Sequence, residues 1–340
     1  RLTAGVLVWQ SFDSELRGDS SLSTRPMKRI SEPLSSMGAK LLLTPENTPP
    51  IKISGNTELS AISYEMPIAS AQVKSAILFA ALNVKGVTKI TEPLITRNHT
   101  ELMFKQIGVD IQVNNNEILL SGQNDFEGFE IDIPGDFSSA AFLIVGALIS
   151  PNSSILIKDV GLNPSRTALI EVLLSMNADI EIQNQRKFGE EEVGDLKVNY
   201  SELVSCKVDA EVIPNLIDEL PILFIASLFA EGESKFFGIE ELKHKESDRL
   251  VAMQSGLKNL GIDTQYNNDT FSIDGKGSNF LLQEGQIDSF EDHRIAMSFI
   301  IAGLRAKKQI QIMNSNCINT SFPEFISQLD SLGAILNESK

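Results

Sequence analysis

The sequence KQIGVDIQV at residues 105–113 decides the fold class, because it passes from a helix pattern through a turn into a strand pattern. Gly108 is the residue type that suits the position after a helix end, where the backbone enters the left-handed region at little cost. Ile111 and Val113 then alternate with polar residues, as in a half-buried strand. The same pattern recurs at intervals of about 70 to 84 residues, at Met37-Gly38-Ala39, Met176-Asn177-Ala178, Leu260-Gly261-Ile262 and Leu332-Gly333-Ala334.

A second, more apolar helix is expected between these markers. Its four instances are residues 70–82, 138–149, 220–230 and 293–304, generally followed within a few residues by Gly or Pro and then by a β-branched run. The sequence therefore predicts an α/β protein in which a βαβαββ-like module is used about five times. A chance recurrence of helix, glycine and strand is the alternative, and the nearly constant spacing favours true repetition.

One segment interrupts the repeat and marks a domain border. Ile133-Pro134-Gly135-Asp136 places Pro, Gly and a capping Asp directly before an apolar helix, which is the composition of a hinge. We therefore expect an N-terminal lobe over residues 1–134 and a C-terminal lobe over residues 135–340. Residues 183–195 are polar and rich in charge, which predicts an exposed loop or hairpin.

Composition excludes several classes of protein. The 340 residues carry 45 acidic and 29 basic side chains, a net charge of −16, so no nucleic acid is expected as a partner. No run of eighteen apolar residues predicts a membrane span. With two cysteines and no motif for a metal, a nucleotide or a dinucleotide, no metal and no cofactor are expected. We expect a monomer in the cytoplasm.

Basic residues lie at the predicted helix starts, where the helix dipole disfavours them. Each such placement costs about a few tenths of a kcal/mol unless an anion shares the exposed N–H groups. Pairing of each arginine with a nearby acid, such as Arg249 with Glu246, is the alternative for any single site. The recurrence at five related places favours a cleft for a multiply charged small anion, and it involves Arg25, Arg97, Arg166, Lys245 with Arg249, and Arg294.

Acidic residues alternate with these bases. Asp218 and Glu219 precede one apolar helix, Glu246 lies between Lys245 and Arg249, and Asp292 precedes another helix. Carboxylates at such positions are most often plain helix caps. A carboxylate that is partly desolvated among cations can instead exchange protons. The pattern thus permits acid–base chemistry on an anionic substrate.

Eight short motifs occur in order along the whole chain. They are GDSSLSTRPM at 18–27, ASAQVKSA at 69–76, RNHTE at 97–101, PGDFSSA at 134–140, IDELP at 217–221, KESDR at 245–249, DHRIAM at 292–297 and TSFP at 320–323. Their spacing alone would not name a family, but in residues and order they closely resemble the 5-enolpyruvylshikimate-3-phosphate synthase family.

The resemblance implies a fold and a reaction. The fold would be a two-domain inside-out α/β barrel built from βαβαββ repeats, the enolpyruvyl transferase fold. The enolpyruvyl group of phosphoenolpyruvate would pass to the 5-hydroxyl of shikimate 3-phosphate, with release of phosphate through a tetrahedral intermediate. Both small-molecule substrates are anions, as the placement of the basic residues suggests.

The resemblance also assigns site residues by matching positions. Arg25, Arg249 and Arg294 match arginines that bind phosphoenolpyruvate, and their planar forks suit carboxylate and phosphate. Asp218 would be the base near the 5-hydroxyl, Glu246 would exchange a proton with the methylene carbon, and Lys245 would contact the substrate hydroxyl and assist proton transfer. The positions that would bind shikimate 3-phosphate are Ser70, Ala71 through its backbone, Gln72, Arg97, Asp218 and Lys245.

Two other hypotheses follow from departures from the family pattern. The chain opens at Arg1 without Met, and the family's Lys-Ser pair and Asn-x-Gly-Thr loop would lie upstream, so we expect an N-terminally truncated chain. The first alternative to the enzyme is therefore a truncated, non-catalytic fragment that binds anions. The related UDP-N-acetylglucosamine 1-carboxyvinyltransferase carries a reactive Cys five residues before its Arg-Pro pair. Ser20 occupies that position here, which disfavours the second hypothesis.

Overall fold

The computed structural model describes residues 1–55, 58–122 and 127–337. They form two compact units, each with its own apolar core. The first unit comprises Arg1–Asp132 and Phe188–Glu191, and the second comprises Ile133–Lys187 and Glu192–Lys340. This division falls two residues before the border expected between residues 134 and 135.

The first unit contains a complete module with the order β4-α4-β5-α5-β6-β7. Strands β4 and β5 are parallel and joined by α4, while β7 pairs antiparallel with both β5 and β6. The sheet order is therefore β4-β5-β7-β6. The module consists of β4 (Ser63–Glu65), α4 (Ala71–Ala81), β5 (Val87–Thr91), α5 (His99–Gln106), β6 (Ile111–Asn114) and β7 (Glu117–Ser121).

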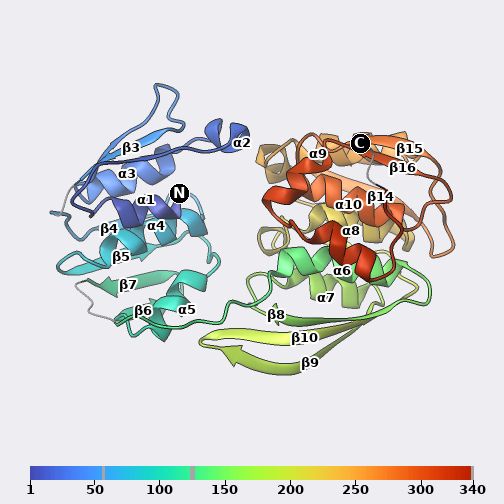
Figure 1. The fold of residues 1–340 in the computed structure, drawn as a ribbon, viewed down its shortest axis with the longest axis horizontal. Coiled ribbons are helices and arrows are strands. Elements are labelled where there is room, and N and C mark those ends of the chain that lie inside the picture. The colour runs from blue at the N-terminus through green and yellow to red at the C-terminus, as the bar shows by residue number, and fades with distance from the viewer. Residues whose placement is uncertain (56–57, 123–126, 338–340) are drawn as a thin grey trace. The chain divides into compact units, whose positions relative to one another are not determined.

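A shorter set of elements precedes this module in the first unit. Its three strands form an antiparallel sheet in the order β1-β3-β2, and helix α1 packs against α4, which also contacts α3. Figure 1 shows α1, α3 and α4 close to one another in this unit. The elements are α1 (Leu2–Leu7), β1 (Ser14–Leu16), α2 (Ser20–Ser23), α3 (Lys28–Ser36), β2 (Lys40–Leu42) and β3 (Ile51–Ser54).

The second unit repeats the complete module. Strands β11 and β12 are parallel and joined by α8, and β14 pairs antiparallel with β12 and β13, so the order is β11-β12-β14-β13. This order matches that of the module in the first unit. The elements are β11 (Lys207–Val208), η1 (Ile213–Asn215), α8 (Leu220–Leu228), β12 (Glu231–Phe237), η2 (Glu240–His244), α9 (Arg249–Asn259), β13 (Thr264–Asn267) and β14 (Thr270–Lys276).

Two related sets of elements flank this module. In the set before it, β8, β10 and β9 form a sheet, and Gly135 bridges to β8 in parallel. In the set after it, β15 and β16 are parallel and joined by α10. The elements are α6 (Phe137–Ile149), β8 (Ser154–Gly161), α7 (Ala168–Ser175), β9 (Asp179–Phe188), β10 (Glu191–Asn199), β15 (Gly285–Asp288), α10 (His293–Gly303), β16 (Ile310–Met313), η3 (Ser315–Thr320) and α11 (Phe325–Ser331).

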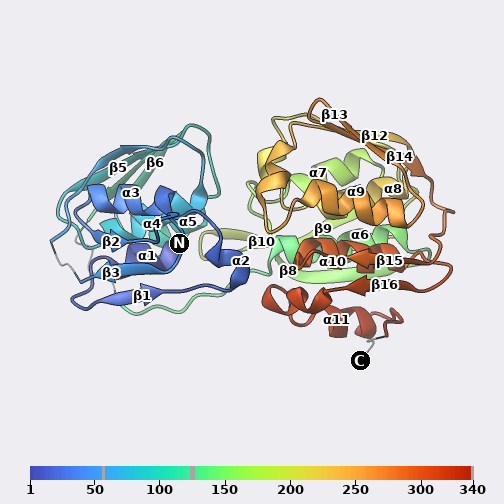
Figure 2. The same cartoon turned by 90° about the horizontal axis from the view of Figure 1, so that it is seen from above.

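Three apolar helices form the centre of the second unit. Helices α6, α8 and α10 contact one another, and all nine residues of α8 are buried. Each also packs against a strand of its own set, β8, β14 and β16 respectively. Figures 1 and 2 show the β8–β10 sheet and the β12–β14 sheet on the outer sides of this unit. The apolar helices predicted from the sequence are thus internal, as the inside-out description requires.

The turn markers behave as the sequence predicts. Gly38, Gly108, Gly261 and Gly333 have φ of 100°, 82°, 78° and 94°, and Asn177 has φ of 70°. All five therefore follow their helices in the left-handed region. The repeated α/β module is confirmed. Residues 183–195, predicted as an exposed loop or hairpin, form the hairpin between β9 and β10. Asp195 in this hairpin is buried rather than exposed.

Candidate active site

The starts of α8, α9 and α10 carry the charged residues of the second unit. Asp218 and Glu219 precede α8, Lys245 to Asp248 precede α9, and Asp292 precedes α10. Asp248 and Asp292 are the helix caps that the sequence allowed, since they accept from the backbone N–H groups of Val251 and Arg294. The three helices pack side by side in the order α8, α10, α9, so their starts bring these residues together.

Arg249 is the central cation of this cluster. Its side chain is 1% exposed, and its Nε lies 2.8 Å from Oδ2 of Asp292, while its Nη2 lies 2.6 Å from Oε2 of Glu246. The pair with Glu246 is the local i, i+3 pairing that the sequence left as the alternative to an anion site. The third guanidinium nitrogen, Nη1, is buried without a hydrogen bond. Such an orphaned donor is costly and suits an anion.

Asp218 lies among three cations. Its carboxylate is 3.5 Å from Arg166, 3.8 Å from Arg249 and 4.0 Å from Lys245. The carboxylate of Asp218 therefore has a positive charge on several sides. The backbone carbonyl of the same residue accepts a hydrogen bond of 2.7 Å from Nη1 of Arg294.

Glu246 and Lys245 occupy the segment that enters α9. The Glu246 side chain is 27% exposed, so one face of it reaches solvent beside the buried Arg249. Burial lowers the pKa of Lys245, and Asp218 and Glu241 oppose that effect. A lysine with a lowered pKa can give up its proton more readily than a solvated one. The pair therefore supplies two groups suited to proton exchange.

Glu219 lies under the start of α8 and is 2% exposed. It accepts a hydrogen bond from the hydroxyl of Ser138, and its Oε1 lies 3.5 Å from Arg294 and 4.0 Å from Arg166. Burial raises the pKa of Glu219, and the two arginines oppose the rise. This carboxylate is thus an internal counterion for two cations.

The first unit positions the other predicted binding residues at two helix starts. Ser70 caps α4 by accepting from the N–H of Val73 at 3.4 Å, and Gln72 lies in the first turn, where its Oε1 accepts from Arg1 at 2.6 Å. Ala71 begins this helix, whose first turn has no acidic residue. Arg97 precedes α5. A helix start with free N–H groups is a suitable site for an oxyanion.

A buried ion cluster joins these two helix starts. Lys74 in α4 lies 3.0 Å from Glu92 after β5 and 2.7 Å from Glu101 in α5, and the three side chains are 1–3% exposed. Lys74 also donates to the backbone carbonyl of Thr96 at 3.4 Å. The segment that carries Arg97 is therefore held against α4.

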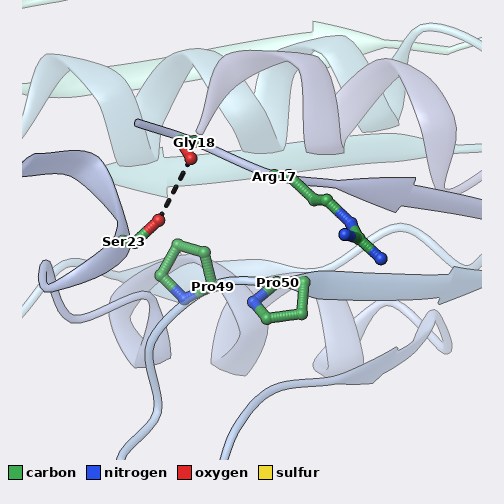
Figure 3. Close-up of a pocket in the computed structure, with 5 residues that line it drawn as sticks. All are labelled: Arg17, Gly18, Ser23, Pro49 and Pro50. Carbon is green, nitrogen blue, oxygen red and sulfur yellow. Dashed lines mark hydrogen bonds between the residues drawn. The ribbon is translucent and has the colours of Figure 1, made fainter. Parts of the chain in front are cut away.

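Arg25 also belongs to the first unit, and it precedes α3 by more than the sequence suggested. The helix begins at Lys28, with Met27 at its N-cap position, rather than directly after Arg25. A cavity of about 330 Å³ lies beside this segment, lined by Arg17, Gly18, Ser23, Pro49 and Pro50 (Figure 3). None of the predicted site residues lines this cavity.

The predicted residues thus divide between the units. Arg25, Ser70, Ala71, Gln72 and Arg97 belong to the first unit. The second unit brings together Asp218, Lys245, Glu246, Arg249 and Arg294. Within the described parts of the chain, no group of three or more His, Cys, Asp or Glu side chains could hold a metal ion. No helix formed by the described residues is long and apolar enough to cross a membrane.

Sequence reasoning missed the partners that hold these residues. Asp292 was expected as a cap or as an acid near the site, and it is also the partner of Arg249. Ser138 is predicted in no site role and Arg166 only as one of the cations of an anion cleft, and both lie in the hydrogen-bond network around Glu219. Ser138 falls within the motif at 134–140, and that motif was the available signal. Nothing in the pattern around Arg166 indicated its partners.

Comparison with known proteins identifies the family. The sequence model of the family EPSP synthase (3-phosphoshikimate 1-carboxyvinyltransferase) matches residues 1–329. The chain belongs to this family. A 3-phosphoshikimate 1-carboxyvinyltransferase of Legionella pneumophila (strain Paris) is 46% identical over 332 residues, which cover 98% of this chain and 76% of that protein. These findings favour the family over the related sugar-nucleotide transferase.

Solved structures agree with this family assignment. An EPSP synthase from Acinetobacter baumannii superposes with a TM-score of 0.91 at 43% identity, covering all of this chain and 78% of that one. The enolpyruvyl transferase NikO from Streptomyces tendae is 14% identical with a TM-score of 0.76, covering 98% of this chain and 76% of that one. The latter likeness concerns the fold alone, and it confirms the predicted enolpyruvyl transferase fold.

Proposed function

We propose that this chain transfers the enolpyruvyl group of phosphoenolpyruvate to the 5-hydroxyl of shikimate 3-phosphate and releases phosphate. Membership of the EPSP synthase family supports this reaction. The observation that carries it within the structure is the buried Nη1 of Arg249, a cationic donor without a hydrogen bond, next to the carboxylates of Glu246 and Asp218. A cation with an unused donor and two acids in one cluster suits an anion that must gain and lose protons.

Phosphoenolpyruvate would be bound by Arg25, Arg249 and Arg294. Arg249 has its Nε and Nη2 engaged by Asp292 and Glu246, which leaves Nη1 to meet the ligand. Arg294 is fixed by its bond to the carbonyl of Asp218. Guanidinium groups held in this way can stabilise charge on a departing phosphate without reorganising during the reaction.

Shikimate 3-phosphate would be bound by Ser70, Gln72 and Arg97, by the backbone of Ala71, and by Asp218 with Lys245. The start of α4 lacks acidic residues, so its N–H groups favour a phosphate. Arg97 is held close to that helix by the cluster around Lys74. The ligand's phosphate and hydroxyl groups would thus meet separate sets of residues.

The proton transfers can be assigned so that the reaction balances. In the addition, Asp218 takes the proton of the 5-hydroxyl while the hydroxyl oxygen bonds to C2 of phosphoenolpyruvate. The acid form of Glu246 gives a proton to C3 of phosphoenolpyruvate. In the elimination, the Glu246 carboxylate takes a proton from the C3 methyl group, and the C2–O bond to phosphate breaks. Asp218, assisted by Lys245, returns its proton to the phosphate. Each group recovers its starting state.

The experiment is release of phosphate from phosphoenolpyruvate and shikimate 3-phosphate. It is run on this chain and on the chain extended upstream by its own coding sequence. We expect phosphate release that needs both substrates and falls at least a hundredfold in Asp218→Asn. Binding of both anions without turnover in either form would support the anion-binding alternative instead. We further propose that the protein acts as a monomer in the cytoplasm and binds no nucleic acid.

A further inference from the structure

Arg166 is a partly buried cation that the proposed chemistry leaves unused. It precedes α7, and its side chain is 11% exposed. Its Nη2 donates a hydrogen bond to the hydroxyl of Ser138, and that hydroxyl donates to Oε1 of Glu219. Ser138 and Glu219 are 4% and 2% exposed. One side of the guanidinium is therefore anchored in a chain of buried hydrogen bonds.

The other side of the same guanidinium faces the proposed base. Nη1 of Arg166 lies 3.5 Å from Oδ2 of Asp218. A guanidinium is planar and rigid, so anchoring Nη2 on Ser138 also fixes the direction in which Nη1 donates. The Oδ1 atom of Asp218 faces two other cations, Lys245 at 4.0 Å and Arg249 at 3.8 Å. The two carboxylate oxygens thus have different neighbours.

We propose that Arg166, anchored by Ser138 and Glu219, is a positioning residue that holds Oδ2 of Asp218 so that Oδ1 accepts the proton of the substrate hydroxyl. This inference rests on the proposed role of Asp218. It gives Arg166, Ser138 and Glu219 roles in the reaction that the family resemblance does not assign to them. Arg166 itself touches no reacting atom in this arrangement.

Several charged groups surround Asp218, and they determine how far removal of Arg166 would change its pKa. Cations face it from the segment before α7 (Arg166), from the segment after η2 (Lys245) and from α9 (Arg249), while Arg294 of α10 binds its backbone carbonyl. Loss of one neighbouring cation makes the carboxylate harder to form, which raises its pKa. The acids near these cations are Asp136, Glu219, Glu241, Glu246 and Asp292.

Two substitutions of Arg166 separate charge from geometry. Arg166→Met removes both the charge and the planar guanidinium. We therefore expect kcat to fall about tenfold to a hundredfold, and the acidic limb of the plot of kcat/KM against pH to move to higher pH. Arg166→Lys keeps the charge but not the planar fork. It should restore the position of the acidic limb while kcat stays below that of the unchanged protein. KM for phosphoenolpyruvate should change less than kcat in both variants.

A matched control comes from another arginine of the same unit. Arg186 pairs with Asp159 and Asp195, two carboxylates of the β8–β10–β9 sheet that have no role in the proposed reaction. Arg186→Met should leave the pH profile unchanged. If Arg166→Met fails to fold, Ser138→Ala and Glu219→Gln release the same guanidinium. Both should lower kcat, and Ser138→Ala should move the acidic limb less than Arg166→Met because the cation remains.

The outcomes distinguish this inference from the proposed function. Turnover in the unchanged protein and its loss in Asp218→Asn would support the function. If the Arg166 variants then keep the original acidic limb, and kcat falls only as far as the folded fraction measured by circular dichroism, the positioning role is wrong. If the unchanged protein releases no phosphate from the two substrates, the proposed function fails first. Calorimetric binding of shikimate 3-phosphate, expected to persist in Arg166→Met, provides a readout that does not need turnover.

Discussion

Arg249 at the start of α9 and Asp292 at the start of α10 are joined by two contacts, from Nε to Oδ2 at 2.8 Å and from Nη2 to Oδ1 at 3.4 Å. Both side chains are almost fully buried. Asp292 also caps α10 by accepting from the backbone N–H of Arg294, so one carboxylate contacts both of the α9 and α10 arginines that we propose bind phosphoenolpyruvate. Asp292 thereby links the packing of α9 on α10 to the geometry of the cluster.

Removing the charge of Asp292 should therefore weaken binding of phosphoenolpyruvate. We expect Asp292→Asn to raise its dissociation constant about tenfold to a hundredfold, because a hydrogen bond between charged partners contributes about 1.5–3 kcal/mol. Asp248→Asn is the matched control, since Asp248 caps α9 in the same way and Asn caps as well as Asp. Calorimetric titration of both variants measures the difference. Equal affinities in the two would contradict the orienting role of Asp292.

Glu246→Gln should separate binding from turnover. The amide keeps the size of the side chain but cannot exchange the proton with the methylene carbon, so we expect kcat to fall by about 10² to 10⁴ with both substrates still bound. Glu241→Gln is the control, because Glu241 is 70% exposed and also lies near Lys245, at 3.8 Å. Steady-state kinetics of the two variants would decide the role, and a nearly unchanged rate in Glu246→Gln would remove it from the mechanism.

The sequence was sufficient for the repeated module, because its signals are local. A helix end followed by Gly or Asn and an alternating strand involves neighbouring residues only, and all five markers adopt the expected left-handed backbone. The short strands β1 and β4, each of three residues, follow no such marker. Their positions depend on pairing with distant segments, as in the register of Ser63 with Lys89.

The candidate site was predictable in its members but not in its contacts. The basic and acidic residues at helix starts were visible as charges out of place on a helix dipole. Their partners depend on how helices pack, so the pairing of Arg249 with Asp292 and the anchoring of Arg166 on Ser138 left no periodic trace. The Glu246 pair with Arg249 was foreseeable because the two are three residues apart on one segment.

The turn at Gly261 tests the local signal that specifies the fold. Its φ is 78°, and a Cβ added there would meet nothing within 4 Å, so the cost of a substitution is that of the backbone alone. Gly261→Ala should lower the free energy of unfolding by about 1–2 kcal/mol. Gly261→Asn should cost less, because Asn177 adopts φ of 70° at the corresponding turn. Thermal unfolding of the two variants measures both losses. Equal losses of unfolding free energy would show that the left-handed backbone at residue 261 is not the cause.

Lys74 should determine the stability of the first unit, because it is the cation of a buried cluster with two carboxylates. Lys74→Met leaves Glu92 and Glu101 without their cation, and we expect the free energy of unfolding near neutral pH to fall by about 3–5 kcal/mol. Trp9, the single tryptophan, packs against the core of this unit. Its fluorescence during urea unfolding measures the loss.

The pH dependence of the stability lost in Lys74→Met identifies the cause of that loss. Burial raises the pKa of Glu101, so the folded protein holds the proton of this carboxyl more tightly than the unfolded chain does. Stability from such a group is complete below its unfolded pKa of about 4.3 and is lost as pH rises through the folded value. Without Lys74 the folded pKa of Glu101 rises further, so the loss of unfolding free energy in Lys74→Met should shrink as pH falls toward 4.5. A loss caused by poorer packing would not depend on pH in this way. Adding Glu101→Gln to Lys74→Met should recover part of the stability near neutral pH, because it removes the carboxylate whose charge is no longer balanced.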